Sequence, residues 1–212
     1  MDEVLSHAKG FLALNNELKM PFDQTFIDVL SKAELPVTRQ ITPNAAKLLD
    51  KIKAIIDGEV VYESDMFYTV RGSGERIPFS LEASGFRKLG LLWKLLRNGL
   101  LEARSILFWD EPEASMNPEL IPNLVDMLFE LQRGGVQIFV ATHSYDVARW
   151  FELNKTEENS LKYFNLRRTS SGIEADVAED YISLPNNIIE GAGEKLYVRI
   201  VDVAAQNAGV RL

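Results

Sequence analysis

The stretch Ser105-Ile-Leu-Phe-Trp-Asp-Glu-Pro-Glu-Ala-Ser-Met-Asn-Pro118 decides how this chain folds. Its start is mostly apolar, as in a buried strand, and runs directly into two carboxylates, Asp110 and Glu111. Further on, Asn117 can cap a helix whose first residue is Pro118. Ligands of α/β sheets bind beyond the carboxyl ends of the strands. The acidic pair is therefore expected at a ligand-binding edge.

Strand and helix patterns alternate around this stretch. Residues 85–97 carry leucines on one face, as in a helix. Gly134-Gly135 closes the next helix, residues 136–141 form a second apolar strand, and Ser144 can cap a third helix. Buried strands separated by helices indicate a parallel sheet. The expected fold class is α/β, a parallel sheet with flanking helices.

Two domains are expected. Residues 1–57 form a helical segment with breaks at its prolines, and in it Asn44 is expected to cap a helix that Gly58 ends. Residues 58–212 form the second domain. Patterning within it also predicts strands at 60–62 and 66–70, a hairpin turn at 71–75, hairpin strands at 161–166 and 173–177, and a final helix near 190–206.

Composition excludes several classes of protein. The 212 residues have a net charge of −8, which argues against a general coat for nucleic-acid phosphates. Without cysteine there is no disulfide, thiolate zinc site or cysteine nucleophile. The start, Met1-Asp2-Glu3-Val4, lacks the basic and apolar regions of a signal peptide, and the apolar runs are too short for a membrane span. The expectation is a cytoplasmic chain with no membrane partner.

Asp110 and Glu111 are the first candidates for chemistry. A magnesium ion on a nucleotide takes few protein carboxylates, so Asp110 can hold it directly or through water. Glu111 can then orient or deprotonate an attacking water. The alternative is an ordinary acidic pair at a strand end that faces solvent.

His143 and Ser84-Gly85 add to this pattern. His143 follows the second apolar strand, where it can bond a terminal phosphate and hold a water; the alternative is a histidine with a structural partner near a helix start. Ser84-Gly85 opens a helix whose free N–H groups attract an anion, and Arg87 and Lys88 in its first turn suit a nearby phosphate. The alternative for Ser84 is a plain helix cap.

Three segments occur in the order of an ABC-type ATPase: residues 81–89, 106–118 and 137–144. Over roughly residues 58–165 the chain resembles the AAA-type ABC ATPases, a group that includes the overcoming-lysogenization-defect nucleases and is more distantly related to SMC-like repair ATPases. The resemblance implies part of a P-loop NTPase fold, with ATP and Mg²⁺ as cofactors. Residues 1–57 then resemble the tail of a helical insertion.

The resemblance also implies a role for each matching residue. Asp110 corresponds to the Walker B carboxylate that binds magnesium, Glu111 to the hydrolytic glutamate and His143 to the switch histidine.

Other matching residues correspond to an interface. Ser84 and Gly85 belong to the signature motif, which contacts the nucleotide of the opposite subunit. Ser115, Met116 and Asn117 form the D-loop, which crosses the dimer interface. The resemblance thus implies a homodimer, with nucleic acid as a partner by analogy alone.

Two departures from the family limit the function. Phe86 stands where transporters have the second signature glycine, which argues against transport. The sequence also has no Gly-x-x-x-x-Gly-Lys-Ser/Thr loop; Gly72-Ser73-Gly74 is followed by Glu75-Arg76 and fits a hairpin turn. We expect the isolated chain to bind ATP weakly or not at all and to need a segment or subunit that carries this Walker A loop. The alternatives are a non-catalytic interaction module that keeps the fold and, with less support, a helicase.

Overall fold

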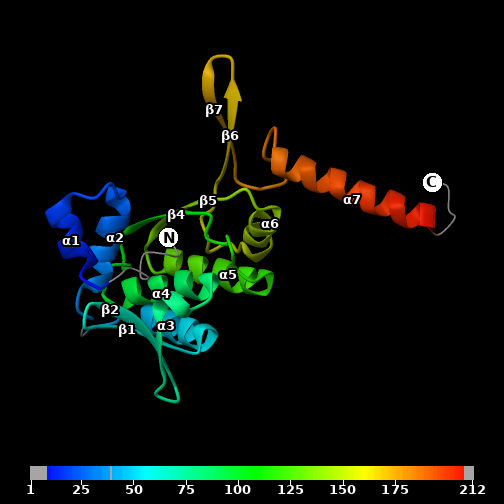
Figure 1. The fold of residues 1–212 in the computed structure, drawn as a ribbon. Coiled ribbons are helices and arrows are strands. Elements are labelled where there is room, and N and C mark those ends of the chain that lie inside the picture. Colours follow the sequence, from blue (N-terminus) through cyan, green and yellow to red (C-terminus); the bar gives the residue numbers. More distant parts are fainter. Residues whose placement is uncertain (1–8, 39, 208–212) are drawn as a thin grey trace. The chain divides into compact units, whose positions relative to one another are not determined.

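The computed structural model describes residues 9–38 and 40–207. Residues 1–8, 39 and 208–212, and with them the expected features of Met1–Val4 and the outer ends of both expected domains, lie outside the described residues. The chain divides into two compact units, residues 1–141 and 142–212 (Figure 1). The expected domain boundary at residue 57 stays a prediction.

Three helices precede the first strand: α1 (Phe11–Leu18), α2 (Gln24–Glu34) and α3 (Pro43–Ile56). The prediction that Asn44 caps α3 is wrong, because the Thr42 hydroxyl accepts the hydrogen bond from the Ala45 N–H. Proline is favoured at the first helical position, so the cap lies one residue before Pro43.

Gly58 does not end α3, contrary to the prediction. The helix ends at Ile56, and the cap residue that follows, Asp57, has a left-handed backbone with φ of 50°. Gly58 begins the following strand, opposite Arg71. A Cβ atom at position 58 would lie 2.7 Å from the Val70 carbonyl oxygen. Glycine is required here by the close approach of the neighbouring strand.

The next strands form an antiparallel sheet in the order β1 (Gly58–Glu63), β2 (Met66–Arg71) and β3 (Arg76–Pro78). Between β2 and β3, the Gly74 N–H donates to the Arg71 carbonyl at 2.9 Å. The Arg71 N–H donates to the Glu75 carbonyl, also at 2.9 Å. Gly72-Ser73-Gly74 is thus a hairpin turn, as predicted. A short 3-10 helix, η2 (Phe79–Leu81), follows.

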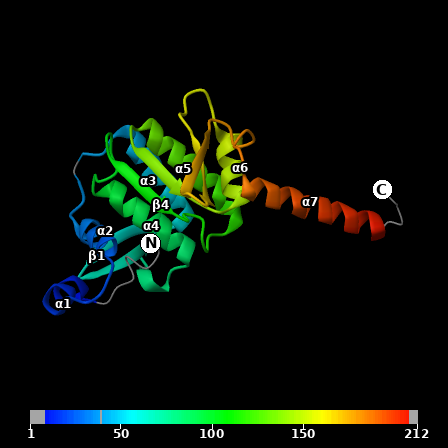
Figure 2. The same ribbon diagram turned by 90° about the horizontal axis from the view of Figure 1, so that it is seen from above.

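Helix α4 (Ser84–Arg97) is the central element of the first unit. Figure 1 shows it between β4 (Ile106–Asp110) and the sheet that contains β1 and β2, and Figure 2 shows the arrangement from above. Leucines of α4 line a small cavity together with Leu107 and Trp109 of β4. Ser84 is the first residue of the helix and not its cap, since Ala83 occupies that position and makes no side-chain capping bond.

Gly90 on α4 gives a test of this packing. A Cβ atom there would lie 2.5 Å from the Phe79 ring and 3.0 Å from a methyl group of Val60. We expect Gly90→Ala to lower the free energy of unfolding by about 1–3 kcal/mol, because the packed core has no room for the added methyl group. Thermal denaturation measures this loss. The control is Gly191→Ala in helix α7 (Ile188–Asn207), where nothing lies within 4 Å and alanine is expected to be neutral or stabilising. Equal effects at both positions would contradict the packing.

Strands β4 and β5 (Gln137–Ala141) form a parallel pair, as predicted, and their register runs from Ile106 opposite Gln137 to Asp110 opposite Ala141. The connection contains η3 (Pro118–Leu120) and α5 (Ile121–Arg133). As predicted, the Asn117 side chain caps this connection by accepting the Glu119 N–H at 3.1 Å.

The two faces of the parallel pair differ. Leu107 and Trp109 are buried against α4. On the opposite face Ile106, Phe108 and Phe139 are 55%, 67% and 43% exposed. The rings of Phe108 and Phe139 stack there with centroids 4.7 Å apart. We call Ile106, Phe108 and Phe139 the open face of the sheet. Parallel sheets are usually covered on both faces, whereas this apolar face is exposed.

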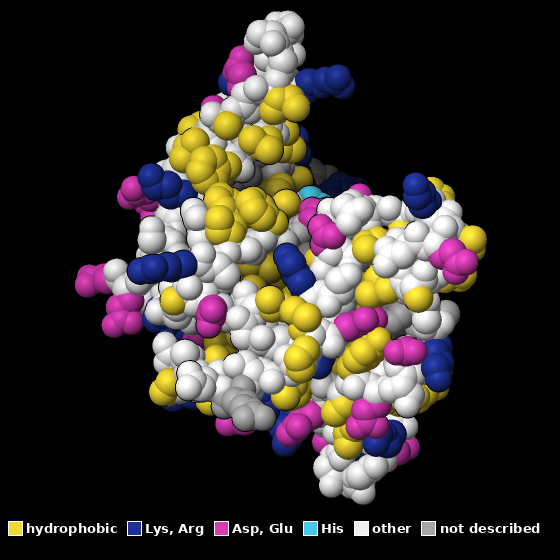
Figure 3. All heavy atoms as spheres, turned by 90° about the vertical axis from the view of Figure 1, so that its left-hand side faces the viewer, with side chains coloured by type: hydrophobic (Ala, Val, Ile, Leu, Met, Phe, Trp, Pro, Cys, Tyr) yellow, Lys and Arg dark blue, Asp and Glu magenta, His cyan; other side chains and the backbone are white. Residues whose placement is uncertain are grey.

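The second unit begins with α6 (Tyr145–Asn154), and the predicted cap is confirmed because Ser144 accepts the Val147 N–H. The antiparallel hairpin β6 (Tyr163–Thr169) and β7 (Gly172–Ala178) and the final helix α7 are also as predicted. Figure 3 shows hydrophobic side chains at the surface of the hairpin, at the top of the view. In the described part of the chain, none of the helices combines the length and apolarity that a membrane crossing needs.

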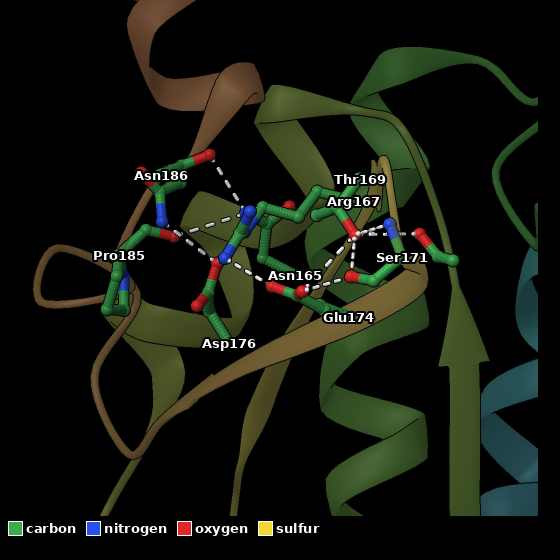
Figure 4. A network of polar contacts seen from close by, with 9 residues as sticks. Asn165, Arg167, Thr169, Ser171, Glu174, Asp176, Pro185 and Asn186 are labelled. Atoms are coloured by element: carbon green, nitrogen blue, oxygen red, sulfur yellow. Dashed lines mark hydrogen bonds and ion pairs between the residues drawn. The ribbon is translucent and has the colours of Figure 1, made fainter.

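A polar network holds the other face of this hairpin (Figure 4). Asp176 accepts bonds from Asn186 at 3.1 Å and from Arg167 at 3.0 Å. These two bonds, the first being the stronger cause, lower the pKa of the Asp176 carboxyl. Asn165 donates to the carbonyl groups of Pro185 and Asn186. The hairpin is therefore tied to the segment that leads into α7.

Candidate catalytic loop

Asp110 is the last residue of β4 and is exposed. Side chains alternate between the faces of a strand, so Asp110 shares its face with Ile106 and Phe108. The carboxylate therefore lies at the carboxyl edge of the open face. This edge is the position at which α/β sheets bind ligands.

Glu111 has a strained backbone, since its φ of 47° is in the left-handed region. Two hydrogen bonds hold it: its N–H donates to the Ala141 carbonyl at 2.8 Å, and its carbonyl accepts the Ala114 N–H at 3.1 Å. The first bond ties it to the end of β5. Left-handed non-glycine residues persist where surrounding contacts impose them, and such positions gather at functional sites.

Lys88 contributes a further contact to this loop. Its side chain reaches from α4 to three carbonyl oxygens, those of Glu111 at 2.8 Å, Pro112 at 3.4 Å and Ala114 at 2.7 Å. The residue is only 5% exposed. The sequence-based interpretation that Lys88 suits a phosphate is wrong, because its ammonium is buried and bonded to backbone. Helical spacing places Lys88 one turn from the buried residues Gly85 and Leu92, but this spacing alone does not reveal the loop carbonyls that the ammonium contacts.

The first turn of α4 packs directly on the same loop. A Cβ atom on Gly85 would lie 3.3 Å from the Cα atom of Met116, so glycine permits this approach. Met116 is buried, and its N–H donates to the Glu113 carbonyl at 2.8 Å. Ser115, just before it, is exposed and has a φ of 60°. The structure thus brings Ser84 and Gly85 beside the loop that carries Glu111, Ser115 and Asn117.

A partly buried ion pair precedes α4 and was not predicted. Arg71 at the end of β2 bonds both carboxylate oxygens of Glu82, at 2.8 and 3.1 Å, and also donates to the Ile56 carbonyl. The pair fixes the segment that leads into Ser84. No sequence pattern indicated it, because the two residues lie on separate elements and meet only in the tertiary structure.

His143 belongs to the second unit, where it is exposed and immediately precedes the cap residue Ser144. Its expected action together with Glu111 stays a prediction.

The donor set suits a magnesium ion that is bound mainly by a nucleotide. Among the described residues there is no cluster of three or more histidine, aspartate or glutamate side chains of the kind that builds an all-protein metal cage. Mg²⁺ usually takes one or two carboxylates together with phosphate oxygens and water. A single exposed carboxylate at a strand end, Asp110, fits that requirement.

The model of one protein family, described as "AAA domain, putative AbiEii toxin, Type IV TA system", matches residues 4–148. The chain belongs to this family. The α/β fold with a parallel sheet agrees with that membership, which places this AAA domain among the ATP-binding, P-loop NTPase-type proteins of the ABC/AAA class.

The chain is also similar to two individual proteins. The arginine transport ATP-binding protein ArtP of Haemophilus influenzae is 23% identical over 158 residues, which are 70% of this chain. The match spans 57% of that protein's length. The second is the Smc head domain with an extended coiled coil, solved as a crystal structure bound to the C-terminal domain of ScpA and derived from Pyrococcus furiosus. It is 12% identical with a TM-score of 0.46, and the match covers 89% of this chain and 42% of the Smc chain.

Proposed function

We propose that this AAA domain supplies the catalytic loop and the signature segment of an ATPase that hydrolyses ATP at a subunit interface. The observation that carries the proposal is the joining of these two parts: α4, which starts with Ser84-Gly85, is bonded and packed to the loop that follows Asp110. An acidic pair that merely faced solvent would need neither the strained backbone of Glu111 nor the Lys88 ammonium bonded to its carbonyl oxygen.

In this proposal three residues act on the nucleotide. Asp110 binds the magnesium ion, which supplies charge neutralisation for the phosphates when bound. Glu111 orients the attacking water and accepts its proton. His143 holds the water or the terminal phosphate.

Four residues would face a second subunit. Ser84 and Gly85 lie in the first turn of α4, at the end of the helix where the helix dipole attracts an anion. Ser115 and Asn117 are exposed on the adjoining loop. A homodimer would bring these residues to the nucleotide held by the partner subunit.

We further propose that a segment carrying a phosphate loop completes the site by packing on the open face. Two features support this occupant. Asp110 lies on the same face as the stacked Phe108 and Phe139, so whatever covers the aromatic rings also adjoins the magnesium carboxylate. The sequence contains no phosphate loop of its own, and without one most phosphate contacts are missing.

Titration with MgATP tests this function. We expect the isolated chain to show no heat of binding at micromolar concentrations of MgATP. Hydrolysis is expected once a strand–phosphate loop–helix segment from a relative of the same family is supplied, fused or in trans. Tight binding by the isolated chain would contradict the need for a second segment. Absence of hydrolysis from a complex that forms would favour the alternative, a non-catalytic interaction module.

A further inference from the structure

Lys88 is a charged side chain in the core of the first unit. It lies on α4, 5% exposed, among leucines and beside the small cavity that Leu107 and Trp109 also line. A buried ammonium is costly unless its donors are bonded. Here the donors point at three carbonyl oxygens of a single loop, at 2.7 to 3.4 Å.

The loop needs this support because of its own conformation. Glu111 and Ser115 both have positive φ, at 47° and 60°. Two hydrogen bonds within the loop stabilise these turns: the Ala114 N–H donates to the Glu111 carbonyl, and the Met116 N–H donates to the Glu113 carbonyl. The Lys88 ammonium adds a cation at the side where the carbonyl oxygens of Glu111 and Ala114 converge. Converging carbonyl dipoles repel each other, and a cation between them removes that repulsion.

Lys88 also connects two parts of the proposed site. It is one helical turn from Gly85, which touches Met116 at the other end of the loop. The loop is thus held to α4 at both ends, by hydrogen bonds near Glu111 and by packing at Met116. The first turn of α4 and the backbone of Glu111 are therefore linked through contacts with the same loop.

We propose that Lys88 is a positioning residue that fixes the backbone of residues 111–114 and thereby sets the place of the Glu111 carboxylate relative to Ser84-Gly85. This inference rests on the function proposed above for Glu111. It concerns a side chain that contacts neither nucleotide nor metal and acts only through the loop.

Amide hydrogen exchange of the chain alone tests whether Lys88 fixes the loop backbone, and it does not require ATP hydrolysis. Lys88→Met keeps the length and apolar stem of the side chain and removes the ammonium. We expect the amides of Ala114 and Met116 to exchange at least about tenfold faster, with little change in the middle of α4. The control is Lys94→Met, the same change at another buried lysine of α4 that is placed further from the loop. Wild-type exchange in Lys88→Met would overturn the proposal.

Steady-state kinetics of the completed ATPase, which is this chain together with the supplied phosphate-loop segment, test whether Lys88 sets the position of the Glu111 carboxylate. A displaced catalytic group costs up to about 100-fold in rate, so Lys88→Met is expected to lower kcat by that order with KM for ATP changed by less than about threefold. Lys94→Met is expected to keep kcat. A rise in KM that matches the loss in kcat, or equal losses in both variants, would indicate a merely structural role and overturn the proposal.

A second variant covers the case in which Lys88→Met does not fold. Lys88→Arg keeps the charge, but its planar fork cannot match three carbonyls arranged around an ammonium. We expect a lowered kcat at an unchanged melting temperature, and full kcat with wild-type exchange would contradict the proposal. If the wild-type complex shows no hydrolysis, the proposed ATPase function fails, while the exchange result still decides whether Lys88 holds the loop.

Discussion

Glu111→Gln in the completed ATPase is expected to lower kcat by about 10²–10⁴-fold, the range that a general base contributes. The amide keeps the shape of the side chain and cannot accept the proton of the attacking water. Because Glu111 is held through its backbone N–H and carbonyl, the substitution leaves the bonds to Ala141 and Lys88 in place. The affinity for MgATP is therefore expected to stay within about threefold, since the backbone that positions the loop is unchanged.

The measurement is phosphate release under saturating MgATP, with nucleotide binding followed in parallel. Glu119→Gln is the matched control, because Glu119 is exposed and lies in η3, beyond the loop. A variant with wild-type kcat, or an equal loss in Glu119→Gln, would contradict the role of Glu111.

Phe108→Glu is expected to weaken binding of the phosphate-loop segment by about 30- to 1000-fold, equivalent to about 2–4 kcal/mol. The reason is burial: the ring is 67% exposed in the isolated chain and stacks on Phe139, so the pair offers an apolar anchor that a covering segment would desolvate. A carboxylate at this place would be buried without a partner. The stability of the isolated chain is expected to change little, because the ring contributes little to its core.

Calorimetric titration of the supplied segment measures this change, and circular dichroism checks the fold of the variant. The control is Phe164→Glu on β6 of the second unit, which makes the same change at a strand residue that is 58% exposed. Equal affinity of wild-type and Phe108→Glu chains would contradict docking on the open face and leave the role of Glu111 untouched. Equal losses in Phe108→Glu and Phe164→Glu would indicate a general effect of charge.

Local sequence signals predicted most elements of the fold. The apolar strands before Asp110 and before Thr142, the caps at Asn117 and Ser144, and the turn at Gly72-Ser73-Gly74 are present as expected. These features depend on neighbouring residues only, through side-chain alternation, capping and glycine conformations. The errors at Asn44 and Gly58 were also local, since Thr42 and Asp57 were equally plausible ends for the same helix.

The candidate site was predicted only in part, for a physical reason. Asp110 and Glu111 follow a strongly apolar strand, so their position at the edge of the sheet could be inferred from pattern. Lys88 could not be assigned correctly, because a lysine in a first helical turn faces either solvent, an anion or the core, and the choice depends on a loop more than twenty residues away.

The sequence by itself indicated most of the strands and helices from residue 58 onward, the resemblance to the family, and the position of the acidic pair at the end of an apolar strand. The tertiary structure alone decided that α4 and the loop after Asp110 are one packed unit, that Arg71 pairs with Glu82, and that one face of the parallel sheet is exposed. The division follows from the range of the forces. Periodicity and caps act within a few residues, whereas packing and buried charge depend on which distant segments share a low-dielectric core.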